Sequence, residues 1–124
     1  MTFIELKKIA EQKVNPRELS DDCQVASVAS ALVTDKGTVY VGVCIDTACS
    51  LGFCAEHSAI AQMITNNESR IQRIVAVGRN GKILPPCGRC REFIYLVNKE
   101  NLETEVLVSE NKIVKITDLL PFPV

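Results

Sequence analysis

The sequence predicts a layered α/β fold, and three patterns support this prediction. Two segments rich in Val and Ala and joined by a turn signal are typical of a β-hairpin, and a later apolar run is typical of a buried strand. Two further segments begin at cysteines and have helical spacing. Strands and helices in this order pack as layers. With 124 residues and no repeat or linker-like stretch, we expect a single domain over residues 1–124.

The first half of the chain is expected to form a helix and then the hairpin. The opening helix would end at Asn15 and Pro16. Its apolar face would comprise Ile4, Leu6, Ile9, Ala10 and Val14. The hairpin strands are expected at residues 25–34 and 38–45, with the turn at the DKG segment between them. Ser27 and Ser30 are the polar interruptions of the first strand.

The second half is expected to contain two buried helices separated by a strand. The first helix would cover residues 54–65, and residues 71–78 are apolar enough for a buried strand. The second helix would begin near Cys87, and its apolar positions are Cys90, Phe93, Ile94 and Val97. Short strands are expected at residues 106–109 and 112–116, and Thr117 would cap a final helical turn.

Composition excludes several classes of partner. The chain is 47% apolar and 23% charged with a formal net charge of -1, and its Lys and Arg residues are scattered, so we expect no nucleic-acid partner. The N-terminus carries charges every few residues and no apolar run is long enough to span a bilayer. We therefore expect a cytoplasmic protein without a membrane partner.

The six cysteines divide into two groups by their spacing. Cys87 and Cys90 form a CxxC, and Cys54 lies about thirty residues upstream. Because no export signal is seen, metal binding, catalysis or burial is expected rather than disulfides. The remaining three are Cys23, Cys44 and Cys49; we interpret the last two as buried small apolar groups, with a disulfide between them as the alternative.

The spacing places a carboxylate beside a possible metal site. Glu56 lies four residues before Ile60, and therefore on the core-facing stripe of its helix. If the two helices lie side by side, Cys54, Cys87 and Cys90 converge, and three thiolates are good zinc ligands that leave a fourth position open. Zinc lowers the pKa of a bound water to about 7, so that Glu56 is the obvious proton acceptor.

Other interpretations of these residues stay open at this point. Cys54 and His57 form a CxxH that, with the CxxC, would give a closed and noncatalytic Cys3His zinc site. The CxxC could be a redox pair, and Glu56 could be an acid favoured by the helix macrodipole. Arg89 and Arg91 flank the last cysteine and could be solvated helix charges.

These motifs resemble the cytidine deaminase family. CAE at residues 54–56 and PCGRC at residues 86–90 match its CxE and PCxxC signature, which is a known pattern of zinc deaminases. The likeness extends over nearly the whole chain and is greatest to the short tetrameric cytidine deaminases and to blasticidin S deaminases. It implies a three-layer α/β/α sandwich around a mixed five-stranded sheet, and a homotetramer.

The resemblance also implies a function, namely hydrolytic deamination of a cytosine-type nucleoside in pyrimidine salvage. Glu56 would deprotonate the zinc-bound water, which attacks C4 of the ring, and would carry protons to N3 and to the departing ammonia. The Ala55 N–H would bind the pyrimidine carbonyl, and the backbone near Pro85 would accept from the amino group. His57 stands where the family usually has an arginine. His57 and Arg91 would brace the zinc thiolates without binding the metal themselves.

The chain departs from the family pattern where the ribose is held. An Asn-x-Glu pair is replaced by Cys44 and Asp46, of which Asp46 could accept from a sugar hydroxyl. The family phenylalanine near the base is also absent, and Phe53 and Phe122 are candidates to replace it, although we expect both to pack in the core. A blasticidin S-type aminonucleoside is an alternative substrate, supported by VAS at residues 25–27 and PCGRCR at residues 86–91 and weakened by the missing phenylalanine. A closed structural zinc site is the alternative outside the enzyme class.

Overall fold

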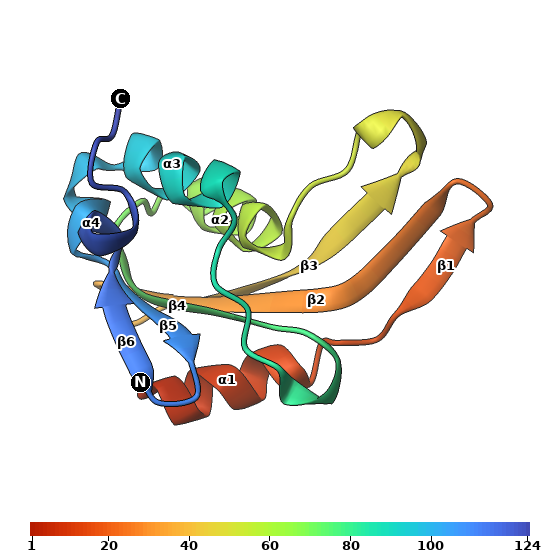
Figure 1. Ribbon diagram of the computed structural model, residues 1–124, viewed down its shortest axis with the longest axis horizontal. Helices are drawn as coiled ribbons and strands as arrows, with labels where there is room; N and C mark the ends of the chain where they lie inside the picture. Colours follow the sequence, from red (N-terminus) through yellow and green to blue (C-terminus); the bar gives the residue numbers. More distant parts are fainter.

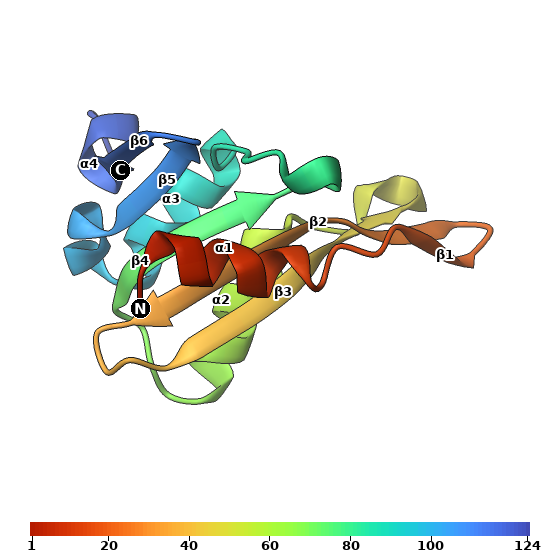
Figure 2. The ribbon, with the colours of Figure 1, turned by 90° about the horizontal axis from the view of Figure 1, so that it is seen from below.

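A computed structural model describes all residues, 1–124, as helices on both faces of one sheet (Figure 1). Helix α1 (Phe3–Glu11) covers one face, and helices α2 (Ala55–Thr65), α3 (Gly88–Val97) and α4 (Ile116–Leu119) lie on the other. The view from below shows α1 lying across the middle strands (Figure 2). None of the helices is both long enough and apolar enough to cross a membrane.

The sheet is mixed, as predicted, and has one strand more than predicted. Its central order is β3 (Val39–Thr47), β2 (Cys23–Thr34), β4 (Ile71–Val77), β5 (Glu105–Ser109) and β6 (Lys112–Lys115), and only the β4–β5 pair is parallel. The sixth strand, β1 (Arg17–Ser20), is antiparallel to the start of β2. All four residues of β1 are exposed, so no apolar alternation marks it in the sequence.

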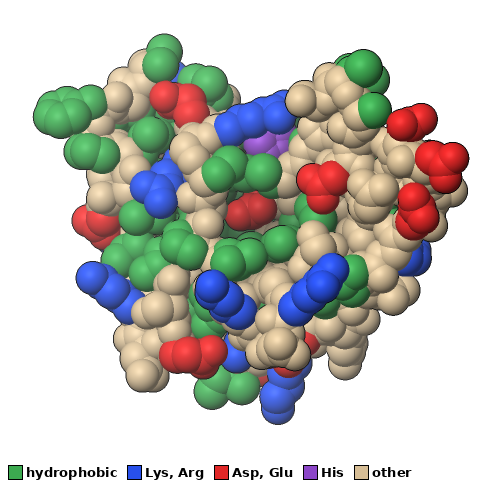
Figure 3. Space-filling view, turned by 45° about the vertical axis from the view of Figure 1, so that its right-hand side comes forward, with side chains coloured by type: hydrophobic (Ala, Val, Ile, Leu, Met, Phe, Trp, Pro, Cys, Tyr) green, Lys and Arg blue, Asp and Glu red, His purple; other side chains and the backbone are tan.

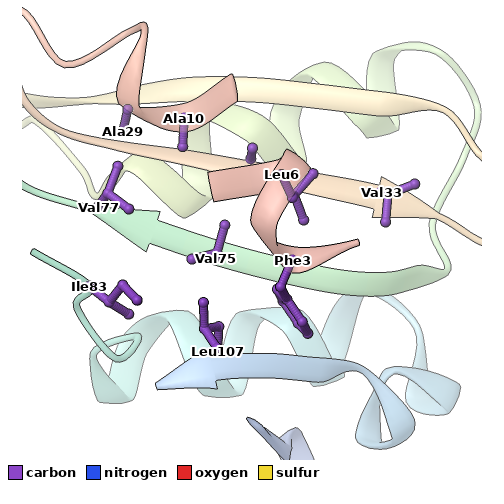
Figure 4. Packing of buried hydrophobic residues seen from close by; sticks show 10 residues of the cluster. Phe3, Leu6, Ala10, Ala29, Val33, Val75, Val77, Ile83 and Leu107 are labelled. Atoms are coloured by element: carbon purple, nitrogen blue, oxygen red, sulfur yellow. The ribbon is translucent and has the colours of Figure 1, made fainter. Parts of the chain in front are cut away.

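Strand β2 is buried on both faces and separates two apolar cores. Ala29, Ala31 and Val33 face α1, and Leu32 between them faces α2 and α3. Figure 4 shows the core beneath α1. The second core is formed by Leu32, Tyr40, Ala59, Ile60, Met63, Ile71, Ile74, Ile94, Val106 and Ile116. A strand covered on both faces needs apolar residues at nearly every position, which accounts for the continuous run in the sequence.

The opening helix is shorter than predicted, and one residue of its predicted apolar face is exposed, whereas Leu6, Ile9, Ala10 and Val14 belong to the core or pack against it. It begins at a capping box in which Thr2 and Glu5 exchange hydrogen bonds, and it ends at Glu11. Phe3 packs in the core, whereas Ile4, which was predicted to be buried, is 71% exposed. Phe3, Leu6 and Ala10 share one helical face, so the apolar stripe begins one residue earlier than the prediction.

The hairpin of β2 and β3 contains an irregularity beside the candidate site. The turn ends in Gly37 with a φ of +83°, which a residue with a side chain rarely adopts. Ala26 has a φ of 66°, and the register between β2 and β3 shifts between Val25 and Ala29. This β-bulge changes the direction of Ser27 and Val28, and both residues line the hollow described below.

The last helix does not have the predicted cap. Helix α4 begins at Ile116, so Thr117 lies inside it rather than at its N-cap. Lys115 occupies the N-cap position, and Asp118 accepts a hydrogen bond from the Lys115 backbone N–H at 2.9 Å. An acidic side chain in the first turn thus replaces the expected threonine hydroxyl.

Candidate active site

Two helix N-termini carry the candidate metal ligands. Cys54 is the N-cap residue of α2 and Cys87 is the N-cap residue of α3, and neither forms a side-chain capping hydrogen bond. Cys90 lies in the first turn of α3 and is fully buried. Pro85 and Pro86 hold the chain extended before Cys87. A Ser or Asp at an N-cap would use its side chain to cap the helix. Because neither cysteine does so, both thiols are free to bind a ligand.

The chain before Cys54 is fixed by the neighbouring strand. Phe53 and Ile45 exchange backbone hydrogen bonds of 2.9 and 3.0 Å. A Cβ at Gly52 would lie only 2.6 Å from the Ile45 carbonyl carbon, so a glycine is required for this approach. Strand β3 thus sets where α2 begins.

The three sulfurs have the spacing that one zinc ion requires. The Cys54 and Cys87 Sγ atoms are 3.6 Å apart, and those of Cys87 and Cys90 are 3.5 Å apart. Ligands at about 2.3 Å in a tetrahedron around zinc lie about 3.8 Å from one another. All three sulfurs lie within 4.8 Å of one another, and no histidine or carboxylate belongs to this group. The residues therefore fit a zinc ion held by three thiolates.

The thiols differ in how readily they lose a proton. Burial raises the pKa of Cys90 strongly and that of Cys54 as well. Burial acts on Cys87 in the same direction, but hydrogen bonds from the Cys90 and Arg89 backbone N–H groups, together with contacts to the other two thiols, hold its pKa below the usual value. The charge of a bound zinc ion offsets the cost of the buried thiolates.

Glu56 occupies the position that its spacing predicts. It is only 5% exposed, and it shares its helix face with Ile60 and Met63, which are fully buried. Burial raises the pKa of its carboxyl, whereas hydrogen bonds from its own backbone N–H and from the Cys90 thiol act in the opposite direction. A carboxyl with a raised pKa beside the sulfurs is suited to accepting and returning a proton.

Cys54, Cys87 and Glu56 open into a hollow of about 540 Å³, a usual size for a small-molecule site, whereas Cys90 is buried behind it. Figure 3 shows a hollow with acidic atoms at its floor and hydrophobic side chains around them. Cys54, Glu56 and Cys87 line one part of it, and Cys44 and Asp46 line another. The other lining residues are Ser27, Val28, Ile45, Thr47, Ser50, Gly52, Phe53, Ala55, Ala76, Leu84, Pro85 and Arg89.

His57 lies behind one sulfur and does not complete a fourfold site. Its Nδ1 is 3.4 Å from the Cys90 Sγ, and its ring stacks on Phe93 with a centroid distance of 4.3 Å and an interplanar angle of 12°. Burial and the nearby Arg89 charge lower its pKa. The stacking holds a ring nitrogen against Cys90, an arrangement suited to a hydrogen bond with that sulfur.

The two arginines beside Cys90 differ in their contacts. Arg91 donates from Nε to the Pro86 carbonyl oxygen at 2.8 Å and from a terminal nitrogen to the Leu119 carbonyl oxygen at 3.3 Å. It therefore braces the loop before Cys87, and it forms no hydrogen bond with a thiol. Arg89 is exposed and lines the hollow.

The residues predicted to face the sugar lie together on β3. Cys44 is buried, and its sulfur accepts from the Val28 backbone N–H at 3.3 Å and lies 3.3 Å from the Ser27 hydroxyl. The Asp46 carboxylate is exposed and 4.0 Å from that sulfur. Sequence reasoning did not place Ser27 or Val28 in the site, although a serine within an apolar strand is a signal that could have done so.

Three further expectations about side chains were wrong. Phe53 is 36% exposed and lines the hollow, and Phe122 is 93% exposed, so neither packs in the core. Cys49 is exposed instead of buried. All six cysteines are unpaired, including Cys44 and Cys49.

Comparison with known proteins supports a zinc site at these sulfurs. The model for the cytidine and deoxycytidylate deaminase zinc-binding region matches residues 5–104, which include all three cysteines. A cytidine deaminase of Halalkalibacterium halodurans is 30% identical over 94 residues, covering 67% of this chain and 71% of the relative. One of Mycobacterium tuberculosis is 29% identical over 69 residues, and the match spans about half of that relative, 52%, and 55% of this chain.

The fold agrees with that of a solved relative. The crystal structure of cytidine deaminase from Mycobacterium leprae superimposes with a TM-score of 0.82 and 26% identity, covering 98% of this chain and 99% of the other. The predicted fold and the predicted family are both confirmed by these matches. This chain belongs to the cytidine and deoxycytidylate deaminase family.

Proposed function

We propose that the protein is a zinc-dependent hydrolase that deaminates a cytosine-type nucleoside, such as cytidine or deoxycytidine, to its uracil form. The observation that carries this proposal is a cluster of three sulfurs beside a buried carboxyl, with Cys54, Cys87 and Glu56 lining one hollow. The Cys87 sulfur lies 3.6 Å from that of Cys54 and 3.5 Å from that of Cys90, and the Glu56 side chain beside them is 5% exposed. A closed structural zinc site would not need an acid there, and His57 stands behind Cys90 instead of within the group.

The chemistry divides between the metal and the chain. A zinc ion held by Cys54, Cys87 and Cys90 would supply a polarised water with a pKa of about 7. Glu56 accepts a proton as the water oxygen bonds to C4 of the ring, and it returns protons to N3 and to the departing nitrogen. The C4–N bond then breaks, so that one water is consumed and one ammonia is released. Because burial raises the pKa of Glu56, the carboxyl can hold the proton between these steps.

The walls of the hollow suggest how the substrate is oriented. The Ala55 backbone N–H at the start of α2 would donate to the pyrimidine carbonyl, and the backbone at Pro85 would accept from the amino group, since both residues line the hollow. Asp46 would accept from a sugar hydroxyl, and the Cys44 sulfur would lie against the sugar. Phe53 lines the same hollow and offers an aromatic face.

A substrate panel tests this proposal. Zinc-loaded protein would be incubated with cytidine, deoxycytidine, cytosine and blasticidin S, and loss of the aminopyrimidine absorbance would be followed. Activity on a nucleoside supports the proposal, activity on blasticidin S alone supports the antibiotic alternative, and silence on all four with zinc retained refutes the proposal.

A substitution separates catalysis from metal binding. We expect Glu56→Gln to keep its zinc and to lose turnover by at least about a hundredfold, since general acid–base catalysis contributes about 10² to 10⁴ in rate. Glu100→Gln removes an exposed acid outside the hollow and is the matched control. Loss of zinc on His57→Ala would favour the closed structural site.

We further propose that the protein acts as a homotetramer in the cytoplasm. Exposed apolar side chains support an assembly that covers them: Phe53, which lines the hollow, is 36% exposed, and Leu19, Leu51 and Phe122 are 63%, 78% and 93% exposed. Light scattering after size-exclusion chromatography should give about 54 kDa, for four chains of 13.6 kDa. A mass of one or two chains would refute the tetramer, and recovery of the native protein in a membrane fraction would refute the location.

A further inference from the structure

A tight turn connects strand β3 to helix α2 and borders the active-site hollow. Its residues, 47–51, lie beyond the end of β3 (Figure 1). Two adjacent residues of this turn, Cys49 and Ser50, have φ values of 60° and 54°. Neither is a glycine, and a side chain disfavours this left-handed region of the backbone. Proteins retain such strain mainly where it positions a group for function.

The strained turn places a single side chain in the wall of the hollow. All of residues 48–51 are exposed, but among these four only Ser50 lines the hollow. Its left-handed neighbour Cys49 does not. The Thr47 Oγ1 accepts a hydrogen bond from the Leu51 N–H at 3.1 Å and so closes the turn around Ser50. The turn is therefore built to fix the position of one polar residue beside the ligand space.

Ser50 carries the only hydroxyl lining the hollow that has no hydrogen-bond partner within the chain. The Ser27 hydroxyl lies 3.3 Å from the Cys44 sulfur, and the Thr47 hydroxyl oxygen accepts from the turn itself. The Ser50 hydroxyl is exposed and is engaged by neither of these groups nor by any other. A ligand in the hollow therefore finds this hydroxyl free to donate and to accept.

Ser50 and Asp46 together complement a pair of neighbouring hydroxyl groups. Asp46 lies four residues before Ser50, and both line the hollow. A carboxylate can only accept a hydrogen bond, whereas a serine hydroxyl can donate one as well. Ribose presents two adjacent hydroxyl groups, so that one can donate to Asp46 while the other pairs with Ser50. The other free polar side chain of the wall is Arg89, which lies on α3 near Cys87 and apart from this pair in the chain.

We propose that Ser50 is a specificity-determining residue that binds one of the two adjacent hydroxyl groups of ribose, while Asp46 binds the other. This inference rests on the proposed deaminase function, because it takes the ligand to be a nucleoside. The left-handed turn holds the Ser50 hydroxyl in place before the ligand arrives, so that less freedom is lost on binding. A sugar that lacks either hydroxyl leaves one of the two polar side chains without its partner and binds more weakly.

Product binding tests this role without turnover. Isothermal titration of zinc-loaded protein with uridine, 2′-deoxyuridine and 3′-deoxyuridine should show about fivefold tighter binding of uridine than of each deoxy compound, since a hydrogen bond has about that net strength. Ser50→Ala should erase one of these two differences and keep the other. Cys49→Ala changes the adjacent left-handed residue, which does not line the hollow, and should keep both. Equal binding of all three ligands by the wild type, or two unchanged differences in Ser50→Ala, overturns the inference.

A glycine variant separates sugar recognition from a structural role of the same residue. Ser50→Gly should keep or raise the Tm, because glycine adopts a positive φ without strain, and it should erase the same difference as Ser50→Ala. A lower Tm together with weaker binding of all three ligands would show that the side chain supports the turn, and would overturn the inference.

Turnover then separates this inference from the proposed function. The value of kcat/KM would be compared for cytidine, 2′-deoxycytidine and 3′-deoxycytidine in wild type and in Ser50→Ala. If cytidine is deaminated and the variant changes neither ratio, the role of Ser50 fails and the deaminase stands. If nothing is deaminated while uridine binds with a preference that depends on Ser50, the deaminase fails and the role of Ser50 stands. A change in one ratio supports both.

Discussion

Gly42 lies where β3 passes against α2, and replacing it should disturb both stability and the metal site. A Cβ at this position would overlap the Ala59 backbone nitrogen and the Ser58 Cβ, and it would lie 2.7 Å from the Ser58 carbonyl carbon. The Ser58 hydroxyl also donates to the Val43 carbonyl oxygen at 2.8 Å, so α2 is tied to β3 at this point. Because the obstacle is largely backbone, the helix has to move.

The size of the effect follows from this contact. Overpacking a filled interior costs about 1–3 kcal/mol, and a clash with backbone belongs at about 3 kcal/mol. For a chain of this length that corresponds to a fall in Tm of about 12 °C. Since α2 carries Cys54 and Glu56, while Cys87 and Cys90 belong to α3, a shift of about 1 Å between the helices should lower kcat/KM by about a hundredfold.

Gly42→Ala would be compared with Gly88→Ala by urea unfolding, zinc content and kcat/KM on the best substrate. A Cβ at Gly88 would meet nothing within 4 Å, although this residue lies next to Cys87. Gly88→Ala should therefore be neutral, or more stable by about 0.5–1 kcal/mol because alanine favours a helix. If Gly42→Ala unfolds at the wild-type urea concentration and keeps zinc and activity, the close approach does not position α2.

Three further outcomes are expected from other parts of the molecule. Asn101 is fully buried, accepts from the Ile71 N–H at 2.9 Å and donates to the Ser69 and Ile94 carbonyl oxygens at 3.0 Å each. Asn101→Ala should therefore lower the free energy of unfolding by about 3 kcal/mol. A loss below about 1 kcal/mol in urea unfolding would contradict this. Hydrogen bonds from the Tyr40 and Thr34 hydroxyls lower the pKa of Glu68 below 4.5, so its contribution is present at neutral pH and is lost as the pH falls below that value. The stability difference between wild type and Glu68→Gln should therefore shrink from pH 7 to pH 3, and a constant difference would refute it. Removal of zinc with a chelator should lower the Tm, and added zinc should restore it. The variant Cys90→Ser should not show this response, and a wild-type Tm that does not change with zinc would refute the site.

Much of the fold and the metal site could be predicted because the signals are local. Apolar runs predicted the buried strands β2 and β4, and the CxE and CxxC spacings predicted where Cys54, Glu56 and Cys90 lie on their helices. Both signals depend on the side-chain periodicity of a single helix or strand, which stays the same when the element packs in the fold. The roles of Glu56, His57, Ala55, Cys44 and Asp46 remain predictions for the experiments above.

What the sequence could not predict depends on contacts between distant segments. Strand β1 is fully exposed and exists because β2 extends past β4, so nothing within its own four residues indicates a strand. The bulge requires a positive φ at Ala26, and an alanine in the sequence gives no signal of such a conformation. The bulge nevertheless brings Ser27 into the hollow. The hydrogen bonds of Arg91 could not be predicted either, because the two carbonyl groups that it binds lie on either side of α3 in the chain.

The hydrogen bonds of Arg91 have a practical meaning for anyone who shortens or tags this protein. One guanidinium joins the loop that leads into Cys87 to Leu119, close to the last residue of the chain. The segment around Leu119 therefore helps to hold the loop before Cys87 in place, although it contributes no metal ligand of its own. Engineering of the C-terminus should therefore be judged by metal occupancy as well as by expression, and an N-terminal fusion is the safer choice provided that it spares Thr2.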